Sequence, residues 1–231
     1  KEIKYSFLDF STLEQRKYFC EREVLLNNRF TKGLYLGVVP VRQQGSEIWV
    51  DGIEGKVIDY AIKMKRLKED RQMHRMLEHH QVTLKHIKDV ASTLRKFHQQ
   101  TTIIHQPFDR GVFASRFNDL QSVADFIGIA LGPSSADIIA NAVRTSDAFL
   151  KDHQGLFSKR VADGWVRDCH GDLHSRNIFL YARPILFDCI EFNDEFRQID
   201  ILDELAFFCM DLEAAGFEDL SRSFMTFYFA K

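Results

Sequence analysis

The sequence predicts an α+β fold in which a small sheet comes early in the chain and helices dominate the remainder. Short apolar runs with β-branched residues occur only at residues 35–64 and again after residue 165. Elsewhere the apolar residues recur at helical spacing. Because strands and helices occur in separate blocks, an alternating βαβ arrangement is excluded.

The first element is expected to be a long amphipathic helix from Leu13 to about Phe30. Ser11-Thr12-Leu13-Glu14 has the form of a capping box, which marks a helix start. The residues that follow place spaced apolar side chains among many charges.

Three strands are expected after this helix. Tyr35–Val41, Glu47–Val50 and Val57–Met64 are short and apolar. Asp51-Gly52 lies between the last two strands and is a hairpin signal, although the connection is longer than usual. The first part of the chain is therefore a helix followed by a small antiparallel sheet.

The composition changes after Met64, and helical periodicity then continues to about Leu150. The first helix of this region places on one face Leu84, Ile87, Val90, Ala91, Leu94 and Phe97. A second helix is expected at residues 120–127, stopping near Gly132-Pro133, and Ser134-x-x-Asp137 is expected to cap a third. The change in composition predicts a boundary near residue 65.

The last part of the chain combines a hairpin with a helix. Asn177–Leu180 and Pro184–Cys189 are short apolar runs that predict two paired strands. One further helix, ended by Gly216, is indicated by the spacing of Ile201, Leu205, Phe208 and Leu212.

Composition narrows the class of protein. The 231 residues include 31 Lys and Arg against 33 Asp and Glu, so the net charge of −2 argues against a nucleic-acid partner. No apolar run reaches the length of about 20 residues that spans a bilayer, and no signal peptide opens the chain. No Cys-x-x-Cys pair occurs, so reduced thiols in a cytoplasmic protein are expected at Cys20, Cys169, Cys189 and Cys209.

The chemistry is concentrated in the polar segment His170–Asn177. Asp172 can orient and deprotonate a hydroxyl group, whereas Asn177 and Asp188 supply oxygen ligands of the kind that Mg²⁺ prefers. An Asp, an Asn five residues later and an Asp on a following hairpin form the layout of a phosphoryl-transfer site. A zinc site at His170 and His174 is disfavoured because Gly171 interrupts the helix that such spacing needs.

The same segment resembles the H-G-D-x-H-x-x-N motif of the aminoglycoside phosphotransferase and choline kinase-like superfamily, and it is similar to the H-R-D-x-x-x-x-N loop of protein kinases. Three further segments resemble other motifs of that superfamily and follow the same order along the chain: Leu94–His98, Phe187–Glu191 and Ile201–Ala206. Phe7–Ser11 and Cys20–Glu23 resemble an uncharacterised bacterial branch that is often fused to a P-loop kinase-like domain.

The resemblance implies a protein-kinase-like two-lobe fold, with residues 1–65 as a small, incomplete N-terminal lobe and residues 66–231 as a larger, mainly helical C-terminal lobe. It implies Mg²⁺-dependent transfer of the γ-phosphoryl group of ATP or GTP to a hydroxyl of a small-molecule acceptor. Asp172 would be the base, and Asn177 and Asp188 would hold the metal. His170 would support the loop, and His174 would face the phosphate.

The lysine that contacts the nucleotide phosphates has two candidate positions. Tyr60-Ala61-Ile62-Lys63 resembles the V-A-I-K motif, with Glu69 or Glu78 as the partner of Lys63. Alternatively, the first long helix supplies the partner Glu23, and the lysine is Lys1 or lies upstream. We prefer the second assignment because the helix at residue 84 follows Lys63 almost at once. It leaves the glycine-rich phosphate loop outside the sequence, as expected of a fragment.

Three further alternatives remain open. The chain could be a nucleotide-binding or pseudokinase module that regulates a larger fused protein. The basic run at residues 63–75 is interleaved with acidic residues, which favours a solvated helix face over a nucleic-acid patch. The last alternative concerns a group of acidic residues. They could form an acidic pocket for a cationic substrate, or they could be ordinary charges at helix starts: Asp194, Glu195, Asp200 and Glu204.

Overall fold

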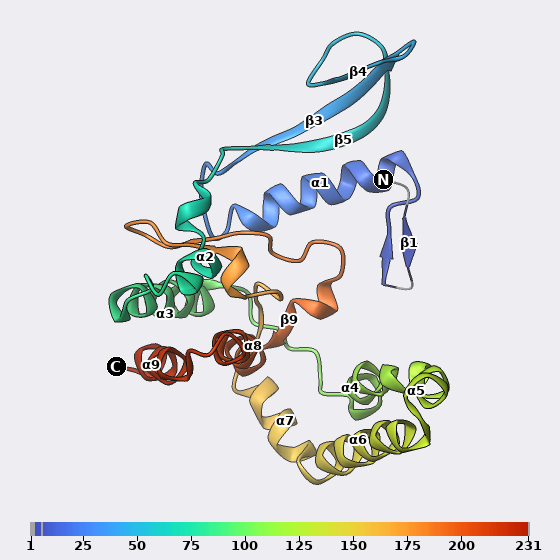
Figure 1. Cartoon of the computed structure of the whole chain (residues 1–231), viewed down its shortest axis with the longest axis vertical. Coiled ribbons are helices and arrows are strands. Elements are labelled where there is room, and N and C mark those ends of the chain that lie inside the picture. The colour runs from blue at the N-terminus through green and yellow to red at the C-terminus, as the bar shows by residue number, and fades with distance from the viewer. Residues whose placement is uncertain (1–2, 6, 231) are drawn as a thin grey trace. The chain divides into compact units, whose positions relative to one another are not determined.

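The computed structural model describes residues 3–5 and 7–230 and is a mixed α+β structure with small sheets (Figure 1). It divides into two compact units, Lys1–Thr102 with Arg167–Lys231, and Ile103–Val166. The expected boundary near residue 65 falls inside the first unit, and the division into two lobes stays a prediction.

The first long helix is confirmed, with two differences at its ends. Two short strands, β1 (Lys4–Tyr5) and β2 (Leu8–Asp9), precede α1 (Leu13–Asn27). The capping box lies one residue later than expected: the Thr12 hydroxyl accepts a hydrogen bond from the N–H of Gln15, and the Gln15 side chain accepts one from the N–H of Thr12. Thr12 has the extended backbone that an N-cap needs.

The three expected strands are present, but their order differs from the expectation. β3 (Tyr35–Gln44) is central and pairs with both β4 (Glu47–Val50) and β5 (Lys56–Met64) in antiparallel register. Asp51-Gly52 therefore joins two strands that do not pair, and the tight hairpin is the one between β3 and β4. β3 has two edges, and its residues Val41, Arg42 and Gln43 pair with β4 on one edge and with β5 on the other.

A linker with no regular structure at residues 65–68 follows β5, so the basic run does not form a helix face as expected. It leads through a 3₁₀ turn, Glu69–Arg71, into α2 (Met73–Glu78) and α3 (Leu84–Gln100). The predicted apolar face of α3 is confirmed in its centre, where Ile87, Val90, Ala91 and Leu94 are buried.

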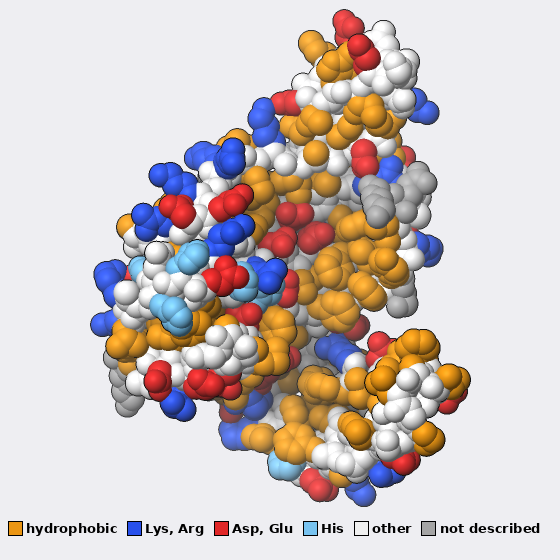
Figure 2. Space-filling view, viewed as in Figure 1, with side chains coloured by type: hydrophobic (Ala, Val, Ile, Leu, Met, Phe, Trp, Pro, Cys, Tyr) orange, Lys and Arg blue, Asp and Glu red, His pale blue; other side chains and the backbone are white. Residues whose placement is uncertain are grey.

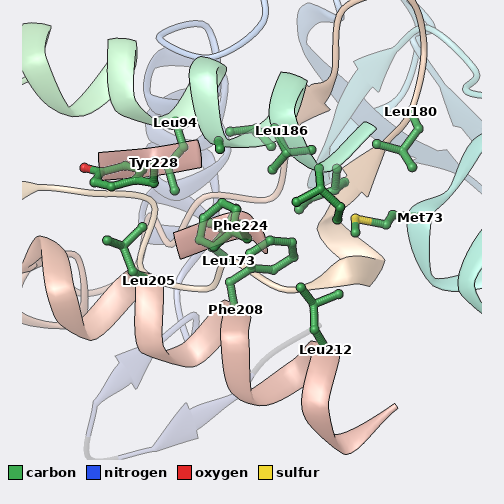
Figure 3. Close-up of a cluster of buried hydrophobic side chains, with 14 of the residues drawn as sticks. Met73, Leu94, Leu173, Leu180, Leu186, Leu205, Phe208, Leu212, Phe224 and Tyr228 are labelled. Atoms are coloured by element: carbon green, nitrogen blue, oxygen red, sulfur yellow. The ribbon is translucent and has the colours of Figure 1, made fainter. Parts of the chain in front are cut away.

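The core of the first unit forms where α3 meets the last two helices, α8 (Ile201–Ala214) and α9 (Glu218–Phe229). Figure 3 shows Leu173, from the segment between β6 (Val166–Asp168) and β7 (Ile178–Phe179), among Leu205, Phe208 and Phe224 of these helices. β7 pairs with β8 (Ile185–Leu186), which confirms the expected hairpin, and β9 (Gln198–Asp200) precedes α8. The segment that carries the polar motif is thus anchored by a buried leucine in its middle.

The second unit is helical. It contains α4 (Arg110–Phe117), α5 (Ala124–Leu131), α6 (Pro133–Asp152) and α7 (Gln154–Ala162). The expected cap at Ser134 is wrong, because α6 begins at Pro133, whose missing N–H and fixed φ suit the first helical position. Among the described helices, none is both long and apolar enough to cross a membrane.

Candidate active site

The first two residues of the polar motif, His170 and Gly171, are held through their backbone N–H groups by one buried carboxylate. Glu204 of α8 accepts hydrogen bonds through Oε1 from His170 N–H at 2.6 Å and Gly171 N–H at 2.9 Å. Its Oε2 lies 2.6 Å from Nε2 of His98, whose Nδ1 lies 2.7 Å from the hydroxyl of Tyr228. The three side chains, Glu204, His98 and Tyr228, are nearly inaccessible, so they form a rigid support behind the motif.

The turn at Gly171 requires glycine. Its φ is +87°, and a Cβ atom there would lie 2.7 Å from the carbonyl oxygen of Phe196. Both the positive φ and this close approach exclude a larger side chain. The turn directs the chain from the buried His170 to the half-buried Asp172.

Asp172 lies beside a histidine that keeps it ionised. Its Oδ2 is 3.4 Å from Nε2 of His174, and this partner lowers the pKa of the Asp172 carboxyl and raises the pKa of the His174 imidazole. Nδ1 of His174 accepts the N–H of Arg176, which fixes the ring. Asp172 is therefore a carboxylate at neutral pH and can accept a proton.

Asn177 is buried and turned toward Asp172. Its Nδ2 donates to the backbone oxygen of Asp172 at 3.0 Å and to Oδ2 at 3.2 Å. Since both partners are acceptors, the amide nitrogen must face them. The amide oxygen is the atom that this geometry leaves for a cation.

The β7–β8 hairpin brings Asp188 to the same place. Phe187 N–H donates to the oxygen of Asn177 at 3.2 Å, and the Phe187 oxygen lies 2.8 Å from Nε2 of His170. Burial and the nearby charge of Asp172 raise the pKa of the Asp188 carboxyl. Its φ of +65° is costly for a residue with a Cβ and is typical of functional positions.

Two more carboxylates lie near Asp188, and Figure 2 shows acidic side chains gathered beneath α1. Burial, then Glu191 and Asp188, raise the pKa of Glu23 to about 8, and burial, then Asp188, raise that of Glu191 to about 7. Tyr35 hydrogen-bonds Glu23, and its hydroxyl accepts the N–H of Asp188 at 3.3 Å. We call Glu23, Asp188 and Glu191 the carboxylate cluster.

The other candidates for the nucleotide site are placed elsewhere. Lys63 lies on β5 in an exposed ion pair with Asp51 at 2.6 Å. Its proposed partners Glu69 and Glu78 instead lie within ion-pair distance of Arg75 and His74. Lys1 lies outside the described residues.

The end of α1 is tied to both halves of the site by residues that the sequence did not identify. Oδ1 of the buried Asn27 accepts the N–H of Cys189 at 3.0 Å. Arg29 donates to Oδ1 of Asp168 at 2.8 Å and to the oxygen of Cys169 at 3.1 Å. Arg and Asn among other polar residues carry no local signal of such partners.

A buried group of His98, Cys169 and Glu204 has side chains spaced as metal ligands would be. Both ring nitrogens of His98 are already hydrogen-bonded, and burial raises the pKa of the Cys169 thiol well above its usual value. A thiolate and a free imidazole nitrogen are what zinc needs, so this group does not fit a metal. Cys169 and Cys189 are fully buried, as expected of core residues.

Three of the four acidic residues considered for a cationic substrate have other roles. Asp194 pairs with Arg22 and with Arg197, which is 2.6 Å away. Asp200 caps α8 by accepting the N–H of Leu202, and Glu204 holds the motif as described. Glu204 belongs to the Ile201–Ala206 segment, which was the signal that could have identified it.

Comparison with known proteins gives relatives but no activity. The chain is 30% identical over 232 residues to uncharacterized protein Rv2004c of Mycobacterium tuberculosis and to uncharacterized protein Mb2027c of Mycobacterium bovis. Each match covers 99% of this chain and 44% of the relative, so the chain spans less than half of their length. No family model and no solved structure matches the chain.

Proposed function

We propose that this protein is a Mg²⁺-dependent phosphotransferase of protein-kinase-like fold, which moves the γ-phosphoryl group of ATP or GTP to a hydroxyl of a small-molecule acceptor. The β3–β4–β5 sheet with α1 would form the small lobe, and the helices with the β7–β8 hairpin the large one. The observation that carries the proposal is that an ionised Asp172 lies close to Asn177 and Asp188, two residues whose side-chain oxygens are suitable metal ligands.

The donor set fits Mg²⁺. Asn177 and Asp188 offer one amide oxygen and one carboxylate, and Mg²⁺ sites commonly use one or two carboxylates with substrate phosphates as the other ligands. Burial and the charge of Asp172 raise the pKa of Asp188 despite the opposing effect of His170 and His174, so a bound cation would favour the ionised carboxylate. When bound, the ion would neutralise charge on the transferred phosphoryl group.

Asp172 has the properties of the group that receives the proton of the acceptor hydroxyl. It is half-exposed, so an acceptor can reach it, and His174 keeps it ionised. His174 also carries positive charge more readily than an ordinary histidine and supports its assignment to the phosphate side. The main contribution of these residues is orientation, which can lower a barrier by several kcal/mol.

The test is a phosphotransfer screen on the full-length protein with aminoglycosides, amino alcohols and sugars. Asp172→Ala should lower kcat by at least about 100-fold with little change in the free energy of unfolding, because it removes a proton acceptor. Asp219→Ala, an exposed carboxylate on α9, is the matched control and should keep full activity. Retained activity in Asp172→Ala would contradict the proposal.

A second candidate function, a nucleotide-binding module without turnover, is favoured by one observation. Among the described residues, the groups that shift the pKa of Glu23 are carboxylates and Tyr35, with no lysine or arginine. In a protein kinase, the equivalent glutamate forms an ion pair with the lysine that contacts the nucleotide phosphates. Thermal unfolding with ATP, with and without Mg²⁺, detects binding, and the acceptor screen then separates a module from an enzyme.

A further inference from the structure

A cavity of about 430 Å³ lies away from the candidate active site. Its walls come from the linker before α2, the first turns of α3 and the end of β7 with the turn that follows. None of Asp172, Asn177, Asp188 or Glu23 lines it. The lining residues are Lys68, Arg71, Lys85, His86, Asp89, Leu180, Tyr181 and Ala182.

The cavity carries more positive than negative charge. Lys68, Arg71 and Lys85 face a single acid, Asp89, which pairs with Lys85 at 2.5 Å. Within residues 3–5 and 7–230, no ion pair joins Lys68 or Arg71 to a carboxylate, whereas Arg75 of the same basic run pairs with Glu69. Figure 2 shows Lys and Arg side chains gathered over this part of the first unit. Unneutralised cations around a cavity favour an anionic ligand.

His86 adds a hydrogen-bond donor. Its Nδ1 accepts the N–H of Thr83 at 3.2 Å, so the neutral ring carries its proton on Nε2. Burial, with Lys85 and Arg71, lowers the pKa of His86 despite the opposing effect of Asp89. His86 lies in the first turn of the 17-residue helix α3, where the helix dipole is also positive.

The rest of the lining is mainly apolar. Leu180, Tyr181 and Ala182 form it, and the Tyr181 hydroxyl accepts the N–H of Lys68 at 2.9 Å. The cavity therefore combines a cationic side with an aromatic side, and its volume is that of a small-molecule site.

We propose that this cavity binds a phosphorylated small molecule, with the phosphate between Lys68, Arg71 and His86 and the body of the molecule against Tyr181. This site is separate from the proposed phosphotransferase site and does not depend on it.

Hydrogen bonds connect one wall of the cavity to the polar motif. Leu180 N–H donates to the oxygen of Arg71 at 2.7 Å, and Nε2 of Gln72 donates to the oxygen of Arg176 at 2.7 Å. Arg176 precedes Asn177 directly. The segment that contains Arg71 is thus joined by hydrogen bonds to the segment that carries Asn177.

The first test is isothermal titration calorimetry with phenyl phosphate, in EDTA and without nucleotide, so that the Mg²⁺ site does not contribute. Wild-type protein should bind saturably, and more tightly than it binds inorganic phosphate because the phenyl ring contacts Tyr181. The double variant K68Q/R71Q should bind at least tenfold more weakly. Arg75→Gln removes one charge from the same basic run outside the cavity and should bind as wild type does.

A second measurement locates the ligand without relying on affinity. NMR titration of His86 should show its imidazole pKa rising when phenyl phosphate saturates the protein, because the dianion stabilises the charged ring. Absence of saturable binding, equal affinity of K68Q/R71Q and wild type, or an unchanged His86 titration would each overturn the proposal. Asp188→Asn should bind phenyl phosphate normally, which keeps this result separate from the fate of the proposed phosphotransferase activity.

Discussion

Asp172 and Asp188 lie in one candidate site, but their surroundings shift the pKa values of their carboxyl groups in opposite directions. His174 lowers the pKa of Asp172, while burial raises the pKa of Asp188 and of its neighbours Glu23 and Glu191. The carboxylate of Asp172 is thereby kept charged and half-exposed, whereas the pKa values of the other three are raised mainly by burial. The first suits a proton acceptor, and the others suit a cation, which is the division of labour that phosphoryl transfer needs.

The Asp172–His174 pair predicts a pH-dependent contribution to stability. The pKa of His174 is raised from 6.5, so its stabilisation is complete below pH 6.5 and is lost as the pH rises through the higher folded value. The pair is partly exposed and screened, so His174→Gln should cost at most about 1 kcal/mol at pH 6 and nothing measurable at pH 9. Urea denaturation at both pH values measures this, and an equal loss at both would contradict it.

Gly171 makes a second prediction at this scale. Gly171→Ala places a Cβ 2.7 Å from the Phe196 oxygen at a φ of +87°, so backbone and turn must both shift. We expect a loss of about 2–4 kcal/mol, against about 1 kcal/mol for Gly216→Ala. Gly216 is the matched control, because its φ is +83° but nothing lies within 4 Å of its Cβ position. Equal losses in chemical denaturation would show that the close approach does not matter.

At the scale of elements, α1 controls the relation between the motif and Asp188. Its Asn27 holds the segment after Asp188, and its Glu23 joins the carboxylate cluster. Arg29, two residues beyond the end of α1, holds the segment before His170. Arg197 supports the same connection from the other side by donating to Asp168 at 2.5 Å. The end of α1 therefore helps to hold the polar motif and the segment that contains Asp188 together.

Removal of Asn27 should loosen this connection. Asn27→Ala leaves the N–H of Cys189 buried without its acceptor, which costs about 1–3 kcal/mol. Hydrogen exchange at Cys189 should accelerate more than exchange in the α3 core. Asn28→Ala, at the half-buried C-cap of the same helix, should leave that exchange unchanged. Exchange that is equally fast throughout the first unit would indicate general destabilisation instead.

At the scale of the whole molecule, local patterns predicted elements well and long-range pairing poorly. α3 and the β7–β8 hairpin follow from spacing and short apolar runs alone. The sheet order was wrong because Asp51-Gly52 marks a turn without saying which strands pair across it. Pairing depends on which neighbour occupies each edge of β3, and only the folded structure displays this.

The site divides in the same way. The motif residues Asp172 and Asn177 are neighbours in sequence, and their contact could be predicted. Their supports, Glu204, Asn27 and Arg29, are polar residues from distant elements, and burial alone distinguishes them from surface residues of the same types. The roles of such residues can be recognised only once the folded structure is known.

The carboxylate cluster predicts how the whole protein responds to Mg²⁺. Binding at the proposed ligands Asn177 and Asp188 would relieve repulsion among buried carboxylates, so Mg²⁺ alone should stabilise the folded chain, by about 1.4 kcal/mol at ten times Kd. Asp188→Asn should be at least as stable as wild type without Mg²⁺, because it removes a buried charge, and should lose most of the response. Asp219→Ala should keep it. Thermal unfolding over a range of Mg²⁺ concentrations measures both effects, and an equal response in Asp188→Asn would place the ion elsewhere.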